Sequence, residues 1–190
     1  IAAHLIWLGT HALDIGAMTL LLYNFRERED ILRIFEEVAG GRLTPTYLRI
    51  GGVSKDLPDN GIEEKVKAFV QAFPDHIKEY ETLLTKNIIW LKRTKGVGII
   101  SKEDAISFGV TGPTLRGCGV KYDVRKAFPY SSYDEFDFEI PIGSVGDVYD
   151  RYIVRLREME WSNSIVEQAL ERLPKGPFLA NEPRITLPPK

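Results

Sequence analysis

The sequence has a single cysteine, Cys118, and none of the common cofactor-binding motifs. One thiol can form no internal disulfide and no multi-thiolate metal site, which predicts a reducing, cytoplasmic compartment. The chain contains no G-x-G-x-x-G, no Walker A loop, no H-E-x-x-H and no C-x-x-C. We therefore expect this chain alone to bind no nucleotide, zinc ion or iron-sulfur cluster.

An excess of positive charge is also absent. The 25 Lys and Arg residues are balanced by 27 Asp and Glu residues, which gives a net charge of -2 and argues against a nucleic-acid partner. With 190 residues, 44% of them hydrophobic, the chain can bury one sizeable core. We expect one domain.

The three histidines do not form a metal-binding pattern. His4 and His11 lie seven residues apart on one expected helix face, but the sequence offers no third ligand near them. Packing or capping is the better interpretation for both. His76 stands beside acidic residues, and we expect it on a solvated helix face.

The first 25 residues contain no Lys or Arg and are long enough to span a bilayer. Asp14 would cost about 2.5–3.5 kcal/mol inside a membrane, and His4 and Thr10 add further polar groups. The other expected helices are amphipathic, as in helical bundles in water, so we favour a buried core helix over a membrane span. A buried Asp14 then needs a hydrogen-bonding partner, or it lies at a pocket.

Hydrophobic periodicity and capping signals predict several further helices. A capping pair at Asn24 and Glu27 indicates the start of a helix that Gly40 ends, unless the first helix runs straight through. Pro74 should kink the next helical region or divide it in two. The expected helical regions are residues 31–38, 62–85 and 88–95, a short helix from Ser101 to Gly109, and a long one over residues 147–173.

The remaining segments are predicted to lack helices. Residues 42–60 are rich in Pro, Gly, Asn and Asp and should form a long ordered loop. We expect residues 110–133 to be irregular and held by side-chain hydrogen bonds, and the five prolines after Leu173 to keep the tail extended. Phe136, Phe138 and Ile140 alternate with acidic residues, which predicts a short, half-buried strand. The fold class is therefore mainly α with a small β element.

Three stretches, in this order, resemble the D subunit family of NADH:quinone oxidoreductase (respiratory complex I): GTHALDIGAMT at 9–19, YLRIGGVSKDLP at 47–58 and TGPTLRGCGVKYDVRK at 111–126. FRERE at 25–29 and GDVYDRYIVRLREM at 146–159 extend the resemblance over nearly the whole chain. This family is related to the large subunit of nickel-iron hydrogenases. The resemblance implies a helical core like that of the hydrogenase subunit. Residues 1–190 would be the central part of one such domain, truncated at both ends.

The resemblance also implies a function. The chain would belong to a proton-translocating NADH:quinone oxidoreductase, in the peripheral arm on the cytoplasmic side of the inner membrane. A partner subunit would carry the terminal [4Fe-4S] cluster, and quinone, the substrate, would be reduced in a cavity between the two. The subunit itself would bind no metal or other cofactor, because such relatives lack the hydrogenase cysteine pairs. A 30-kDa-type C subunit is another expected partner, and the isolated piece would be inactive.

Within the HALD motif, the resemblance gives Asp14 the role of orienting a quinone-binding histidine or relaying a proton. It places Ile6 and Thr10 along the same wall of the quinone pocket, and Thr10, four residues before Asp14, shares its helix face. A low-dielectric cavity with a few polar groups that deliver protons suits quinone reduction. From the residues alone, a structural cap or pair is the favoured interpretation of Asp14, and the resemblance reverses it.

Three residues are expected near the partner's cluster. Thr44 stands where many relatives have a histidine, which predicts a weaker pH dependence of the cluster potential. Arg116 and Arg125 would direct positive charge towards the cluster or the subunit that carries it. In the alternative that we favour, Asp123 pairs with these arginines to hold an irregular segment together.

Two other functions also fit the sequence. The chain could come from the large subunit of a related membrane-bound hydrogenase or a coenzyme-dependent dehydrogenase, and cysteine pairs in the flanking segments would reveal a hydrogenase. It could also be a non-catalytic helical module that serves assembly. Asp14→Asn in the complete complex separates these, since an assembly module would keep quinone reductase activity.

Overall fold

The computed structural model describes residues 1–181, which form helices and one small sheet. The prediction of a mainly α fold with a small β element is confirmed. The four main helices are α1 (Ala2–Asp14), α2 (Met18–Ala39), α3 (Ile62–Leu84) and α8 (Val148–Glu171). The shorter elements are β1 (Leu48–Arg49), β2 (Gly52–Val53), α4 (Ile88–Thr94), α5 (Lys102–Ser107), α6 (Gly112–Gly117), α7 (Val124–Ala127) and the 3-10 helix η1 (Tyr133–Glu135).

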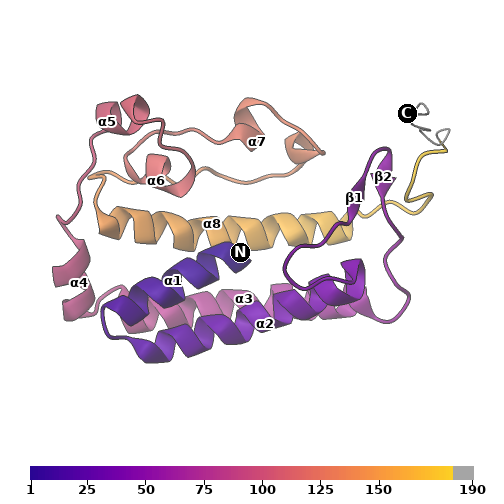
Figure 1. Ribbon diagram of the computed structural model, residues 1–190, viewed down its shortest axis with the longest axis horizontal. Coiled ribbons are helices and arrows are strands. Elements are labelled where there is room, and N and C mark those ends of the chain that lie inside the picture. The colour runs from indigo at the N-terminus through magenta and orange to yellow at the C-terminus, as the bar shows by residue number, and fades with distance from the viewer. Residues whose placement is uncertain (182–190) are drawn as a thin grey trace, which may run out of the picture.

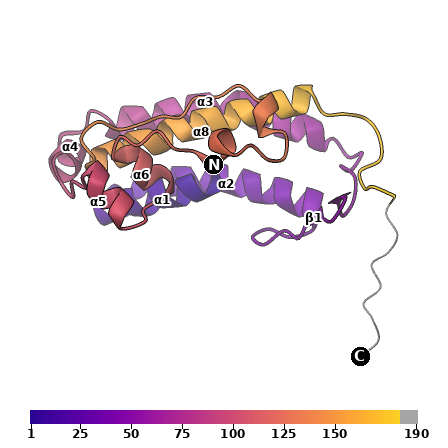
Figure 2. The same cartoon turned by 90° about the horizontal axis from the view of Figure 1, so that it is seen from above.

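The long helices α2, α3 and α8 run side by side, and α1 packs on α2 and α8 (Figures 1 and 2). Their apolar faces, together with α4, enclose the main core, whose buried members include Leu5, Leu8, Leu20, Phe73, Tyr80, Trp90, Tyr152, Leu156 and Met159. The segment from α5 to α7 lies on the other side of α8, where Ala105, Leu115 and Cys118 form a second, smaller cluster. Helix α8 therefore packs against both layers.

The chain turns sharply between α1 and α2. Gly16 has a φ of 103°, a conformation that side-chain-bearing residues rarely adopt, and α2 begins two residues later. The predicted capping pair is therefore wrong: Asn24 and Glu27 lie inside α2 and are buried. The predicted helix end at Gly40 is confirmed. No helix within residues 1–181 is both long enough and apolar enough to cross a membrane.

Helix α3 passes through Pro74 without a break, so the predicted division into two helices is wrong. Proline has no amide hydrogen to donate to the carbonyl four residues earlier, which is that of Val70. Asn163 of α8 supplies the missing donor, with Nδ2 2.9 Å from the Val70 oxygen. A tertiary hydrogen bond therefore replaces the helical one.

The β element lies outside the predicted strand. Strands β1 and β2 pair antiparallel, Leu48 with Val53, inside the segment expected to be a loop without strands. Residues 136–140 form no strand, because both backbone polar groups of Asp137 bond to the Gln168 side chain of α8 instead of a neighbouring strand. Phe138 is nevertheless buried and its acidic neighbours are exposed, as the alternation predicted.

The segment over residues 110–133 is less irregular than expected, since it contains α6 and α7. The other helix predictions are confirmed, and each helix starts at a side-chain cap: Asn87 for α4, Ser101 for α5 and Asp147 for α8. The predicted extended tail lies mostly outside the described residues.

Candidate functional site

The three side chains expected to line a pocket, Ile6, Thr10 and Asp14, follow one another along α1. Ile6 is half-buried, whereas Thr10 and Asp14 are exposed. The Thr10 hydroxyl donates to the Ile6 carbonyl oxygen at 2.8 Å and lies 3.2 Å from that of Trp7. This arrangement holds the hydroxyl in place, and its lone pairs stay available to accept a hydrogen bond from a ligand.

Asp14 is the last residue of α1, and its carboxylate is exposed. The prediction of a buried acid is therefore wrong for this chain, because α1 ends here and the side chain projects beyond the core. No hydrogen bond or ion pair within residues 1–181 involves this carboxylate. A negative charge at the C-terminal end of a helix is also electrostatically unfavourable. Among the described residues, the Asp14 carboxylate therefore neither caps a helix nor pairs with another side chain.

His11 lies one turn before Asp14 and belongs to an aromatic stack. Its ring lies on that of Trp7, with 4.9 Å between centroids and 17° between planes, and meets Trp90 edge-on at 5.4 Å. Burial lowers the pKa of His11, and the charge of Asp14 opposes this only in part. The imidazole is therefore neutral near pH 7. The prediction that His11 serves packing is confirmed.

Glu158 of α8 joins α1 to α6. His4 Nε2 lies 2.7 Å from Glu158 Oε2, and Arg116 Nε donates to Oε1 at 2.5 Å. The carboxylate is 6% exposed. Burial by itself raises the pKa of Glu158, but the hydrogen bonds from His4 and Arg116 outweigh it and hold the pKa below its usual value. Arg116, 8% exposed, is thereby turned into the molecule.

Asp123 caps α7 and binds Arg125. Its Oδ1 accepts from the Arg125 backbone amide and from Nε, both at 3.0 Å, and its Oδ2 accepts from Nη2 at 2.6 Å. Arg116 Nη1 lies 3.8 Å from the same carboxylate. Burial by itself would raise the pKa of Asp123, but the hydrogen bonds from Arg125 outweigh this effect. The pKa therefore lies below its usual value. The alternative in which Asp123 holds this segment together through both arginines is confirmed.

Thr44 is exposed in the segment between α2 and β1. In both ribbon views this segment lies at the opposite end of the long helices from α6 (Figures 1 and 2). The structure therefore brings Arg116 and Arg125 together through Asp123, but it does not place Thr44 beside Arg116.

Sequence reasoning missed the buried charge at Glu27, which is 1% exposed on α2. Its carboxylate accepts a hydrogen bond of 2.7 Å from the Tyr80 hydroxyl and of 2.6 Å from Arg26 Nε, and it lies 3.3 Å from His76 Nδ1. Burial and the neighbouring carboxylate raise the pKa of Tyr80. The charge pattern FRERE carried this signal, since a glutamate on the inner face of a helix needs partners.

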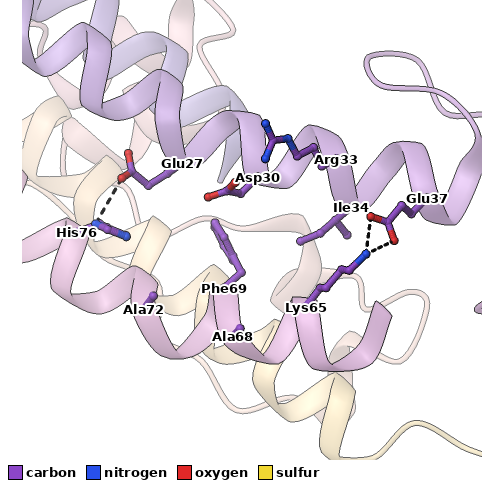
Figure 3. A pocket seen from close by; sticks show the side chains of 10 residues that line it. All are labelled: Glu27, Asp30, Arg33, Ile34, Glu37, Lys65, Ala68, Phe69, Ala72 and His76. Carbon is purple, nitrogen blue, oxygen red and sulfur yellow. Dashed lines mark hydrogen bonds and ion pairs between the residues drawn. The ribbon is translucent and has the colours of Figure 1, made fainter. Parts of the chain in front are cut away.

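Glu27 closes one end of a groove between α2 and α3, with a volume of about 480 Å³. Figure 3 shows the ion pair of Glu37 and Lys65 at the other end, where Lys65 Nζ lies 2.8 Å from both carboxylate oxygens. Ile34 and Phe69 project into the space between the two helices. Within residues 1–181, no group of three or more His, Cys, Asp or Glu side chains is arranged to hold a metal ion.

The family model for "Respiratory-chain NADH dehydrogenase, 49 Kd subunit" matches residues 14–190. The chain belongs to this family. The resemblance drawn from the ordered motifs is therefore confirmed. Asp14 is the first residue of the matched range, so the HALD aspartate lies inside the family model, whereas Ile6 and Thr10 precede the matched range.

Curated relatives align with nearly the whole chain. The chain is 54% identical over 188 residues to the NADH-quinone oxidoreductase D subunit of Geotalea uraniireducens, covering 99% of this chain and 48% of that protein. It is 54% identical over 189 residues to the D 2 subunit of Thermodesulfovibrio yellowstonii, covering 99% and 47%. It is 55% identical over 183 residues to the C/D 1 subunit of Aquifex aeolicus, covering 96% and 30%. The chain spans about half the length of the relatives named as D subunits.

Proposed function

We propose that the chain is the central part of the D subunit of a proton-translocating NADH-quinone oxidoreductase, and that Ile6, Thr10 and Asp14 form part of its quinone pocket. The observation that carries the proposal is the family membership together with the state of Asp14. This carboxylate lies at the unfavourable end of a helix dipole and has no partner among residues 1–181. A charge without a structural role is a candidate for a functional one.

The chemistry of the α1 face suits a quinone. Ile6 offers apolar surface to a ring, the fixed Thr10 hydroxyl offers a polar contact, and Asp14 is an acid that can orient a proton donor or pass a proton on. A [4Fe-4S] cluster in a partner subunit would supply the electrons. The neutral, stacked His11 holds the end of α1 rigid, so the three side chains keep their spacing.

The three residues proposed near the partner's cluster differ in their availability. Thr44 is exposed and free to contact another subunit. Arg125 is half-buried, and Arg116 is held inside by Glu158 and the Tyr122 carbonyl. We infer that the two arginines stabilise the segment around α6 and α7, and that Thr44, at the opposite end of the long helices, makes the contact with the cluster-bearing subunit.

The proposed partners and location follow from the same membership. Two relatives from Aquifex aeolicus are named as C/D subunits, which supports contact with a 30-kDa-type C subunit. The proposed place is the peripheral arm on the cytoplasmic side of the inner membrane. A hydrogenase-like or coenzyme-dependent large subunit is the alternative enzyme, and a silent assembly module is the alternative of another class.

The test is Asp14→Asn in the complete complex. We expect NADH:quinone reductase activity to fall by roughly 100-fold or more, the effect of removing a proton-handling group. Electron transfer from NADH to an artificial acceptor that bypasses the quinone pocket should persist. Asp75→Asn, which removes an exposed carboxylate on α3 that pairs, among residues 1–181, with Lys78 alone, is the matched control.

The outcomes separate the three functions. Full quinone reductase activity of the Asp14→Asn complex would favour the assembly module and contradict the pocket role. Loss of both activities, with an unassembled complex on a native gel, would also contradict it. Wild-type complex that reduces protons or a coenzyme instead of quinone would point to the alternative enzymes.

A further inference from the structure

An arginine of α8 lies over the aromatic stack that ends one turn before Asp14. The guanidinium carbon of Arg155 lies 4.1 Å from the centre of the Trp7 ring, and the same ring stacks on His11 with 4.9 Å between centroids. A cation over a tryptophan ring is attracted by the π electrons. Arg155 is half-buried, and burial lowers its pKa to about 10, so it stays charged near pH 7. The stack therefore runs from a cation through Trp7 to His11.

The neighbouring acid on α8 is already occupied, which leaves Arg155 without a carboxylate. Glu158, one turn further along α8, accepts from His4 with one oxygen and from Arg116 with the other. Within residues 1–181, no ion pair involves Arg155, and its Nη1 donates to the Arg151 carbonyl oxygen at 3.0 Å. The Arg151 guanidinium is itself bound by two backbone carbonyl oxygens. Arg155 is therefore the cation that the fold leaves beside the stack.

Opposing influences decide the charge of His11. Burial lowers its pKa most, and the charges of Arg155 and Arg151 on α8 lower it further. The charge of Asp14 on α1 raises the pKa, and the helix dipole favours a cation in this last turn of α1. Helix α4 presents only the uncharged Trp90 ring, edge-on. Removing the charge of Arg155 would therefore shift the balance towards a charged His11.

A charged His11 does not fit its present position. The Nε2 atom is buried and has no hydrogen-bond partner within residues 1–181. An imidazolium carries a hydrogen on both ring nitrogens, so charging the ring here would bury an N–H group without an acceptor. A charged ring would instead leave the stack and pair with Asp14, because residues three apart on a helix are neighbours on its surface. That pair would occupy the carboxylate on which the proposed pocket depends.

We propose that Arg155 is a positioning residue for Asp14. Stacked over Trp7, its guanidinium keeps His11 uncharged and inside the stack. The Asp14 carboxylate then stays unpaired and available to the quinone pocket, although a basic residue lies one turn away. The inference rests on the proposed function, but Arg155 acts through the stack and does not contact the quinone.

The first test titrates His11 in the complete subunit. The signals of isotope-labelled histidine rings are followed by NMR as the pH falls, and His11→Phe identifies the signal of His11. We expect Arg155→Gln to raise the midpoint by roughly 0.5–1 pH unit, whereas Arg155→Lys keeps the charge and stays close to wild type. Arg157→Gln is the matched control, because this arginine of α8 pairs with Glu81 and Glu160. An unchanged midpoint in Arg155→Gln, or an equal shift in Arg157→Gln, would overturn the proposal.

The second test measures the pH profile of quinone reduction by the complete complex. In Arg155→Gln the activity should begin to fall at a higher pH than in wild type, because a charged His11 pairs with Asp14. Arg155→Lys should follow the wild-type profile. Adding His11→Phe, which keeps a ring in the stack but carries no charge, should restore that profile to Arg155→Gln.

Two results of this second test would contradict the proposal. One is a pH profile that Arg155→Gln leaves unmoved, and the other is a loss of activity that His11→Phe does not repair. Full activity of Asp14→Asn would instead contradict the proposed function. The titration of His11 needs no quinone, so it tests the effect of Arg155 separately.

Discussion

Asn163 of α8 donates a hydrogen bond of 2.9 Å to the carbonyl oxygen of Val70, four residues before Pro74 on α3. Within an unbroken helix this oxygen would accept from the amide of residue 74, which proline lacks. Asn163 is 5% exposed, so no bulk water reaches the pair. The bond explains how a 23-residue helix tolerates an internal proline, and it joins α3 to α8 at the same time.

Replacing Asn163 by leucine should therefore destabilise the protein. The substitution keeps the branched shape of the side chain but leaves the buried Val70 oxygen without a donor, which costs about 1–3 kcal/mol. Urea unfolding of the complete subunit, followed by circular dichroism, measures this loss. In a Pro74→Ala background the amide of position 74 can donate to Val70, so the cost of Asn163→Leu should shrink. Strictly additive effects of the two substitutions would show that the Val70 oxygen is not the link.

Helices α3, α4, α5 and α8 were predictable because their signals are local. Caps at Asn87, Ser101 and Asp147 and the hydrophobic period of α3 and α8 lie within a few neighbouring residues. The effect of Pro74 was not predictable, because its compensation comes from a residue 89 positions later. A long-range partner overrides the local rule.

The strand prediction failed for a related reason. Alternation at Phe136–Ile140 correctly indicates which side chains are buried, but a strand also needs a neighbouring backbone. Gln168 supplies the hydrogen bonds there instead. At the candidate site, the motif identified Asp14, whereas its exposure depends on the turn at Gly16 and on where α1 ends.

A second prediction concerns Glu158 and pH. Its pKa in the folded chain lies below the usual 4.5, so folding favours the charged form. The stability from this group is therefore present above the usual pKa and is lost as the pH falls through the folded pKa. Unfolding of the complete subunit in urea between pH 7 and pH 3 should show this loss.

Glu158→Gln isolates that contribution. At pH 7 it should cost roughly 3 kcal/mol, because Arg116 is left buried without its carboxylate. The acid-dependent loss should be smaller in the variant than in the wild type. Glu160→Gln, which removes a more exposed partner of Arg157, is the control and should cost about 0–1 kcal/mol. Equal acid sensitivity of wild type and Glu158→Gln would show that other groups dominate.

A third prediction concerns the buried pair of Tyr80 and Glu27. Tyr80→Phe removes the 2.7 Å hydrogen bond to a carboxylate that is 1% exposed. We expect a loss of about 1.5–3 kcal/mol, the range for bonds to buried charges. Tyr23→Phe, whose hydroxyl takes part in no hydrogen bond among residues 1–181, is the matched control and should stay within about 0.5 kcal/mol of wild type. Similar urea midpoints for the two variants would contradict this ranking.

A fourth prediction separates function from stability at Asp14. Because the carboxylate is exposed and unpaired among the described residues, Asp14→Asn should leave stability unchanged within about 0.5 kcal/mol. Removing a negative charge from the C-terminal end of α1 should raise the free energy of unfolding slightly. The measurement is thermal unfolding of the complete subunit. A large drop in melting temperature would mean that Asp14 has a structural partner, and its loss of activity would then need another explanation.

The last prediction concerns the approach of two backbone segments at Gly146. Its φ is 80°, and a Cβ at this position would overlap the carbonyl oxygen of Ile100, whose amide donates to the Gly146 oxygen at 3.0 Å. Gly146→Ala therefore combines backbone strain with a clash against main chain that cannot rotate away, and should cost roughly 3 kcal/mol or more. Gly109 has a similar φ of 66° but open space around it, so Gly109→Ala carries the strain alone, about 1–2 kcal/mol. Urea midpoints of the two variants measure the difference. Equal losses would mean that the segment before α8 shifts freely, and then the contact between Ile100 and Gly146 would not fix how the α5–α7 layer sits on α8.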